Sequence, residues 1–253
     1  MTLYLVKWKS LMYSQCTWET EEDVDDAGLV AAYRRRSAPR SAEELAAARR
    51  AVRHPTPARR GVAAQWTPIE RVPEGFYNGM ELRPYQLEGV NWLVRCWREG
   101  RNSILADEMG LGKTAQTVAT IEWLHRQERL RGPFLIVAPL ATLQHWRRES
   151  ETWTSCNTVV YHGAAVDRDI IRRLEWPLRW CAPGPGGPFA FDTLITSFEM
   201  LMADAAVLGK IHWAFLAIDE AHKLKNNTSK TLAAVKQLTY DHVLLLTGTP
   251  FQN

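Results

Sequence analysis

Apolar residues in the second half of the chain fall in short continuous runs, which are residues 103–106 (SILA), 134–138 (FLIVA), 193–196 (TLIT), 215–218 (FLAI) and 243–246 (VLLL). Strands that are buried on both faces of a sheet have continuous apolar sequences, whereas half-exposed strands alternate with polar residues. Segments with helical spacing, such as 113–129 and 141–152, lie between the runs. We predict an α/β fold in which helices cover a parallel sheet.

The first 36 residues follow a different pattern. Residues 3–8 have the apolar spacing of a strand, a second short strand is expected around Thr17 and Trp18, and Asp25 or Asp26 is placed to cap a short helix. The segment from Arg34 to Arg60 is rich in arginine and interrupted by prolines. We interpret it as a basic linker that is either a solvated connector, the favoured interpretation, or a contact to phosphates.

Residues 176–189 contain many prolines and glycines and predict an exposed insertion loop. The length of 253 residues predicts one domain of moderate size with an appendage. The net charge of +3 is too small to indicate a polyanionic partner without a specific site.

The cysteines make no C-x-x-C pair, so we expect reduced intracellular thiols rather than a zinc site or a disulfide framework. No apolar stretch reaches the length of about 20 residues that crosses a membrane. We expect a soluble protein that is neither secreted nor membrane-bound.

A phosphate-binding loop is predicted directly after the run 103–106. Gly110 and Gly112 permit a tight loop with amides directed at phosphates, Lys113 supplies positive charge, and Thr114 supplies a hydroxyl for Mg²⁺. The usual first glycine of this motif falls on Asp107, and a glycine-rich turn that opens a helix is the structural alternative. The predicted nucleotide-binding residues of the loop are Asp107, Glu108, Met109, Gly110, Leu111, Gly112, Lys113 and Thr114.

Two adjacent carboxylates follow the apolar run 215–218. We predict that Asp219 faces Mg²⁺ together with Thr114, and that Glu220 faces the attacking water. A solvated strand end is the common alternative for a lone acidic pair, but the phosphate loop at the end of another strand favours phosphoryl transfer. The turn at 247–250 (TGTP) follows a third run and is interpreted equally well as a γ-phosphate sensor or as a simple turn.

Six segments in series resemble the first recA-like lobe of Snf-type chromatin-remodelling ATPases. They are LRPYQLEGVNWL (82–93), ILADEMGLGKT (104–114), LIVAPLATLQHW (135–146), LITSFEML (194–201), IDEAHKLKN (218–226) and LLLTGTPFQN (244–253). Upstream, residues 4–33 resemble the latter part of a chromodomain. This combination resembles the chromodomain-helicase-DNA-binding family, and its sequence is most similar to the Kismet-like subfamily.

The resemblance predicts three regions, which are the end of a chromodomain at 1–36, a basic linker at 37–79 and a helicase-type ATP-binding lobe at 80–253. It implies that Gln86 reads the adenine edge, that ATP and Mg²⁺ are the cofactors, and that Lys113, Asp219 and Glu220 are catalytic. It also places Pro139–Thr142 and Thr196–Ser197 where the family grips the backbone of duplex DNA, although helix-cap chemistry explains these residues equally well.

The activity implied is DNA-stimulated ATP hydrolysis in the nucleus, coupled to translocation on nucleosomal DNA and to chromatin remodelling. Duplex DNA, nucleosomes and, through the chromodomain, histones are the implied partners. Leu11 stands where a cage aromatic would be expected, so we do not expect methyl-lysine binding, and we expect Trp8 and Trp18 to pack rather than to read a ligand.

Family members place a second lobe, with arginines that close over the γ-phosphate, after Gln252 and Asn253. The sequence is therefore expected to be a fragment that hydrolyses little ATP alone, since an arginine finger contributes roughly 10³ to 10⁵ in rate. The alternative hypothesis is a non-catalytic fragment that binds nucleotide or chromatin. A strand-separating helicase is a third hypothesis, which TGTPFQN and the chromodomain disfavour.

Overall fold

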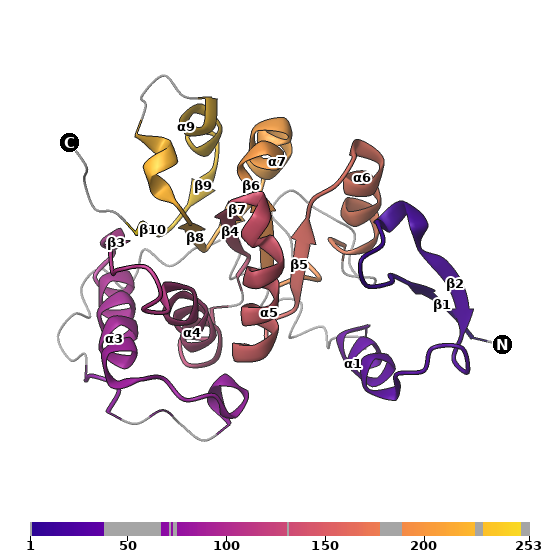
Figure 1. Cartoon of the computed structure of the whole chain (residues 1–253), viewed down its shortest axis with the longest axis horizontal. Helices are drawn as coiled ribbons and strands as arrows, with labels where there is room; N and C mark the ends of the chain where they lie inside the picture. Colours follow the sequence, from indigo (N-terminus) through magenta and orange to yellow (C-terminus); the bar gives the residue numbers. More distant parts are fainter. Residues whose placement is uncertain are drawn as a thin grey trace.

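A six-stranded parallel sheet lies at the centre of the computed structural model, which describes residues 2–37, 67–70, 72, 75–130, 132–177, 189–225 and 230–248 (Figure 1). Its strand order is β3-β10-β8-β4-β6-β5, with parallel pairing throughout. The bounds are β3 (Ser103–Leu105), β4 (Phe134–Ala138), β5 (Thr158–Tyr161), β6 (Thr193–Ser197), β8 (Phe215–Ile218) and β10 (Val243–Leu246).

The five predicted strands are all present, and β5 is an addition to the prediction. β5 is an edge strand with a neighbour on one side only, and buried and partly exposed residues alternate along it. Its four residues lack the continuous burial of the central strands β4, β6 and β8.

Helices cover both faces of the sheet. In β4, Phe134 and Ile136 belong to one apolar core, while Leu135 and Val137 belong to the other. The first core receives α3 (Pro84–Arg98), α4 (Lys113–Arg126) and α5 (Leu143–Trp153). The second receives α6 (Ala165–Leu174), α7 (Phe198–Ala203), α8 (Ala205–Leu208) and α9 (Lys230–Val235). The predicted α/β fold, a parallel sheet covered by helices, is confirmed.

Local signals explain where the helices begin. Pro84 occupies the first position of α3, where its missing N–H is not needed, and the Gln86 side chain accepts from the Arg83 amide at 3.0 Å. The segment predicted as a helix at 141–152 begins as a 3₁₀ turn, Leu140–Thr142, and continues as α5. Among the described helices, none combines the length and the apolar character needed to cross a bilayer.

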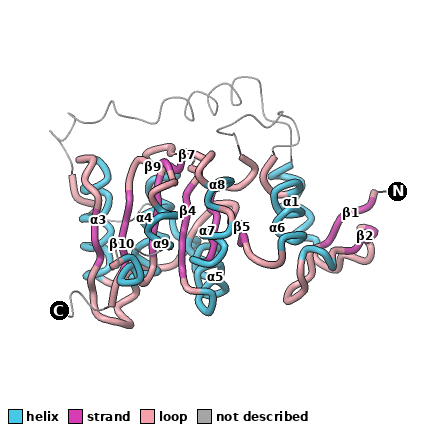
Figure 2. The backbone as a smooth tube through the Cα atoms, turned by 90° about the horizontal axis from the view of Figure 1, so that it is seen from above, coloured by secondary structure: helices cyan, strands magenta, loops and turns pink. Residues whose placement is uncertain are grey.

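The amino-terminal unit consists of an antiparallel hairpin and a helix (Figure 2). The strands β1 (Leu3–Val6) and β2 (Thr17–Thr20) pair with each other, and α1 spans Ala27–Ser37. The Asp26 carboxylate accepts from the Leu29 amide at 2.9 Å, which confirms the predicted cap. This unit matches the strand, strand, helix order that the sequence predicts.

The expectation that both tryptophans of the hairpin pack was wrong for Trp18. Its side chain is 65% exposed, because in the described chain the two-stranded sheet leaves one face uncovered. Trp8 is 39% exposed, and its Nε1 donates to Thr17 Oγ1 at 2.8 Å. Trp8 is therefore held across the hairpin by a polar bond rather than by burial.

The amino-terminal unit rests on α6. The backbone amide of Ser14 donates to Asp167 Oδ1 at 2.9 Å, and Tyr13 donates its hydroxyl to Glu175 Oε1 at 3.1 Å. The bond from Ser14 lowers the pKa of the Asp167 carboxyl, and burial together with Glu175 raises the pKa of the Tyr13 phenol. Both contacts fix the turn Tyr13–Gln15 against α6.

Two predicted segments lie largely outside the described residues. They are the basic linker at 37–79 and the insertion loop at 176–189. One described piece of the predicted linker packs on α3, where the Asn91 side chain bonds both the amide and the carbonyl of Ile69, at 2.6 Å and 3.1 Å. The boundaries predicted for the three regions stay predictions.

Candidate functional site

The strand order brings the predicted chemistry to one edge of the sheet. β3, β10 and β8 are neighbours, and the register pairs Leu246 with Leu105 and Leu245 with Ile218. The loop after β3, the turn after β10 and the acidic pair after β8 therefore leave the sheet side by side at its carboxyl edge, where ligands bind in open parallel sheets. The Thr247 amide, donating to Leu105 O at 3.2 Å, ties two of these segments together.

The loop between β3 and α4 has the backbone of a phosphate cradle. Gly110 and Gly112 have φ angles of 88° and 79°, in the left-handed region that residues with a Cβ rarely adopt. Gly112 is the residue before α4, so the free amides of the first turn of a 14-residue helix point toward the loop. Free amides together with the helix dipole favour an anion at this position.

Lys113 closes the loop from within. Its Nζ donates to Asp107 O at 2.6 Å and to Glu108 O at 2.9 Å. These are bonds between an ammonium and neutral carbonyls, which a phosphate can replace with stronger charge-assisted ones. The ammonium group is thus already directed into the loop, as the prediction requires.

Gln86 lies against the same loop from α3. Its Nε2 donates to Leu111 O at 3.4 Å, and a Cβ on Gly112 would lie 3.5 Å from Gln86 Cδ and closer still to Nε2. This close approach explains why glycine is needed at position 112 in addition to its backbone angle. The adenine-reading role of Gln86 stays a prediction.

Asp219 is held in a fixed orientation. Its Oδ2 accepts from Trp146 Nε1 at 3.0 Å, and its Oδ1 accepts from the Glu220 amide at 2.9 Å. Each oxygen keeps a further lone pair, and hard divalent cations such as Mg²⁺ bind carboxylate and hydroxyl oxygens. Asp219 and the Thr114 hydroxyl, in the first turn of α4, remain the predicted ligands of a magnesium ion.

Glu220 adopts an uncommon backbone conformation. Its φ and ψ are 50° and 48°, the left-handed region, which costs a non-glycine residue about 1–2 kcal/mol. Such strain clusters at functional sites. The Glu220 Oε2 lies 3.1 Å from His222 Nδ1. The two adjacent acids thus have different partners, as their different predicted roles require.

Sequence reasoning missed two supporting residues. Trp146 is 1% exposed and orients Asp219, although no chemical signal in the sequence around it indicates this contact. Gln116 is fully buried, and its Nε2 donates to Asp107 Oδ2 at 3.0 Å. An amide on a predicted helix carries no signal of this contact, because the contact depends on how α4 meets the loop.

The first predicted DNA-contact segment, Pro139–Thr142, follows β4, and the second, Thr196–Ser197, is the end of β6. The Thr142 hydroxyl donates to Pro139 O at 2.9 Å, and Ser197 Oγ accepts from the Met200 amide at 3.3 Å as the cap of α7. Thr196 is fully buried and donates to Tyr161 O at 2.9 Å. These hydroxyls bond to the backbone as caps and turns, which is the alternative role given for them in the sequence analysis. DNA contact by these segments stays a prediction, and the observed hydroxyl bonds do not support it.

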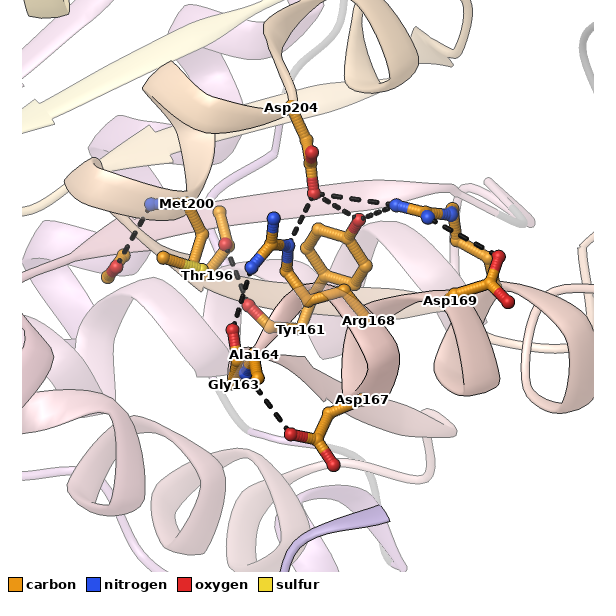
Figure 3. Close-up of polar contacts among 11 residues, drawn as sticks. Tyr161, Gly163, Ala164, Asp167, Arg168, Asp169, Thr196, Met200 and Asp204 are labelled. Atoms are coloured by element: carbon orange, nitrogen blue, oxygen red, sulfur yellow. Dashed lines mark hydrogen bonds and ion pairs between the residues drawn. The ribbon is translucent and has the colours of Figure 1, made fainter. Parts of the chain in front are cut away.

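A polar network fixes the backbone beside Thr196 (Figure 3). Asp204 Oδ2 accepts from Tyr161 at 2.5 Å and from Arg168 Nε at 2.6 Å, and Arg172 donates to the Tyr161 hydroxyl at 2.5 Å. Burial acts to raise the pKa of Asp204, but the bonds from Arg168 and Tyr161 outweigh it, and the pKa lies below its ordinary value. Burial and Asp204 raise the pKa of Tyr161 to about 12.

The turn at 247–250 is described only in part. Gly248 approaches the phosphate loop closely, since a Cβ there would lie 2.8 Å from Met109 Cγ. Thr249 and Pro250 lie outside the described residues, as do Gln252 and Asn253. The contact between Gly248 and Met109 places the start of this turn directly beside the predicted nucleotide site.

Comparison with known proteins agrees with this geometry. A family model described as "SNF2-related domain" matches residues 85–253, and one described as "Chromo (CHRromatin Organisation MOdifier) domain" matches residues 1–36. Among solved structures, the "Sulfolobus solfataricus SWI2/SNF2 ATPase core in complex with dsDNA" has a TM-score of 0.60 and 31% sequence identity, and the match covers 72% of this chain and 35% of that one.

Two curated relatives match almost the whole chain. "Chromodomain-helicase-DNA-binding protein 6" of Rattus norvegicus is 44% identical over 254 residues, 100% of this chain and 9% of that protein. "Chromodomain-helicase-DNA-binding protein 8" of Xenopus tropicalis is 44% identical over 256 residues, 99% of this chain and 11% of that protein. The chain thus spans about a tenth of the length of these relatives. The predicted resemblance to chromodomain-helicase-DNA-binding proteins is confirmed, and the chain belongs to the SNF2-related domain family.

Proposed function

We propose that the chain supplies the ATP- and Mg²⁺-binding half of a DNA-stimulated ATPase that remodels chromatin. One observation carries the proposal, namely that the phosphate loop, the acidic pair and the turn at Thr247 converge at the carboxyl edge of three adjacent strands. Phosphoryl transfer depends on positioning and charge stabilisation, and this edge gathers a cation, loop amides and two acids in one place.

Lys113 and the loop amides bind the phosphates in this proposal. The ammonium of Lys113 exchanges its bonds to the Asp107 and Glu108 carbonyls for bonds to phosphate oxygens. Thr114 and Asp219 would hold Mg²⁺, which when bound neutralises charge on the phosphates. Trp146 keeps the Asp219 carboxylate oriented for this role.

Glu220 orients the attacking water and accepts its proton. The Glu220 carboxylate lies beside His222 and the Asp219 carboxylate accepts from Trp146, and in this proposal Asp219 serves the metal and Glu220 serves the water. The water attacks the γ-phosphorus of ATP, the bond to the bridging oxygen breaks, and ADP and phosphate leave. The imidazole of His222, 3.1 Å from Glu220 Oε2, is the neighbour through which the proton can pass to solvent.

The partners in this proposal are duplex DNA and nucleosomes, with histone contacts through the chromodomain, in the nucleus. The support comes from the chromodomain-helicase-DNA-binding relatives and from the solved SWI2/SNF2 ATPase core, whose structure was determined in complex with dsDNA. We further propose that the chain turns ATP over slowly by itself, because it matches only 35% of the length of that core. Translocation on DNA requires the longer assembly.

Nucleotide binding to the 253-residue chain tests the site directly. A fluorescent ATP analogue is titrated with and without Mg²⁺ against the parent chain, Lys113→Ala, Glu220→Gln and the exposed control Lys210→Ala. We expect binding that Lys113→Ala weakens at least about 10-fold, since it removes a charge-assisted bond, and that the other two variants retain. Binding unaffected by Lys113→Ala would refute the site. Absence of any binding would leave the alternative of a chromatin-binding fragment without nucleotide.

A further inference from the structure

Three side chains with metal-binding atoms meet at the edge of the sheet opposite the nucleotide site. They are His125 near the end of α4, Cys156 in the connection to β5, and Asp192 directly before β6. Their imidazole nitrogen, thiol sulfur and carboxylate oxygen all lie within 4.8 Å of one another. The residues are far apart in the sequence, so only the fold brings them together (Figure 1 shows α4, β5 and β6).

The spacing suits a small ion after a minor adjustment. Zn²⁺ binds sulfur, nitrogen and oxygen at about 2.0–2.3 Å, which puts tetrahedral ligand atoms roughly 3.5 Å apart. Each pair here therefore needs to close by about 1.3 Å at most, within the reach of side-chain rotation. One soft and two harder ligands form a mixed set of the kind that zinc and similar divalent ions accept.

One nitrogen of the His125 ring is unsatisfied within the described part of the chain. His125 Nδ1 is buried, and it has no hydrogen-bond partner among the described residues. A buried ring nitrogen in that state costs about 1–3 kcal/mol unless it finds a bond. An imidazole nitrogen is satisfied either by a hydrogen bond or by a metal ion. The neighbouring thiol and carboxylate favour a metal ion here.

The surroundings favour a cation. Glu122 lies one turn before His125 on α4, is 1% exposed, and accepts from the Ser155 amide at 3.0 Å. The carboxylates of Glu122, which is buried, and of Asp192, which is half-buried, lie beside the buried Cys156 thiol. They create a negative potential that a divalent ion would neutralise, with release of the thiol proton to solvent.

Other contacts hold the ligands in place. Asp192 Oδ2 accepts from the Asn157 amide at 2.8 Å, and the Asn157 side chain donates to Ala190 O at 2.8 Å. The ring of His125 packs edge-on to Phe134, with centroids 6.5 Å apart. Orienting contacts of this kind are typical of metal ligands and raise their affinity.

We propose that His125, Cys156 and Asp192 bind one divalent ion of the zinc type, with water as a fourth ligand. The ion would join the end of α4 to the segments that precede β5 and β6. It would thereby stabilise the edge of the sheet opposite the nucleotide site. The ordinary alternative is that Cys156 is a small apolar core residue, as buried thiols often are.

Metal titration of the 253-residue chain distinguishes a metal site from an apolar core thiol. Co²⁺ serves as the spectroscopic probe for thiolate coordination, and Zn²⁺ affinity is measured by competition with a chromophoric chelator. The site variants are Cys156→Ser, His125→Gln and Asp192→Asn. The controls are Cys96→Ser, another buried thiol, and His145→Gln, an exposed imidazole.

We expect one Zn²⁺ per chain, a thiolate-to-Co²⁺ absorption band that Cys156→Ser abolishes, and affinity losses of at least about 10- to 100-fold in each site variant. The controls keep parent affinity. Circular dichroism monitors folding. Asp192→Asn retains an acceptor for the Asn157 amide, so if Cys156→Ser does not fold, the Zn²⁺ affinity of Asp192→Asn tests the proposal instead. No Zn²⁺ binding, or binding that the controls alone weaken, overturns the proposal.

Discussion

The contact between α3 and α4 beneath the phosphate loop leads to a quantitative prediction at Gly89. A Cβ built on Gly89 would lie 3.0 Å from Gln116 Cδ and closer still to Gln116 Oε1. Gln116 is fully buried and cannot swing into solvent, and its Nε2 holds Asp107 of the loop. The change Gly89→Ala should therefore displace Gln116 and release Asp107.

Opposing effects set the magnitude. Replacement of glycine by alanine inside a helix stabilises by about 0.5–1 kcal/mol. Overpacking of a buried position costs about 1–3 kcal/mol, and loss of a hydrogen bond to a charged group costs about 1.5–3 kcal/mol. The costs win, and we expect Gly89→Ala to lower the free energy of unfolding by about 2 kcal/mol, with a fall in melting temperature of about 2–4 °C per kcal/mol.

Urea denaturation of the 253-residue chain measures this change. The matched control is Gly28→Ala in α1, where the nearest atom to an added Cβ is Asp26 Oδ1 at 3.2 Å, and we expect it to be neutral or stabilising. In the background of Gln116→Ala, Gly89→Ala should cost nothing, because its obstacle is gone. If Gly89→Ala alone stabilises the chain as much as Gly28→Ala does, the steric argument is refuted.

Three further predictions concern the site and the sheet. Trp146→Phe removes the bond to Asp219 Oδ2 while keeping a ring in the core. The Mg²⁺ concentration needed for half-maximal nucleotide binding should therefore rise by about 10-fold. An unchanged Mg²⁺ titration would show that the bond does not orient the acid. Gly112→Ala forces a residue with a Cβ to a φ of 79° beside Gln86. The affinity for the ATP analogue should fall by about 10-fold or more, because of backbone strain of about 1–2 kcal/mol and the clash with Gln86. An affinity equal to that of the parent chain would show that the loop tolerates the side chain. Burial lowers the pKa of His242 to about 4. Between pH 6.5 and 4 this histidine is therefore protonated in the unfolded chain and neutral in the folded chain, and the free energy of unfolding should decline by roughly 3 kcal/mol over that range. His242→Gln should flatten that part of the urea-midpoint profile, and an unchanged slope would assign the decline to other groups.

The sheet and the left-handed glycines of the loop after β3 were predictable because they depend on local sequence. Continuous apolar runs identified the central strands, and the glycines of the phosphate loop identified a backbone that other residues avoid. The roles assigned to Asp219 and Glu220 required only that two acids end a buried strand. Such signals reside within a few residues of one another.

The contacts that were missed all depend on packing between distant segments. Trp146 reaches Asp219 from another helix, and Gln116 reaches Asp107 from the helix that the loop opens. The cluster of His125, Cys156 and Asp192 has no ligand spacing in the sequence. Trp18 was expected to pack, but burial depends on what covers the hairpin and not on the residue type.

Steady-state ATPase activity decides whether the acids after β8 serve ATP hydrolysis. Activity is measured for this chain and for a longer polypeptide that continues through a second ATPase lobe, each with and without duplex DNA and each with Glu220→Gln. We predict that the longer polypeptide hydrolyses ATP, that DNA stimulates it, that Glu220→Gln abolishes it, and that the 253 residues alone show little turnover. A longer polypeptide that binds nucleotide but stays inert with DNA, or one that Glu220→Gln leaves active, would contradict the catalytic assignment.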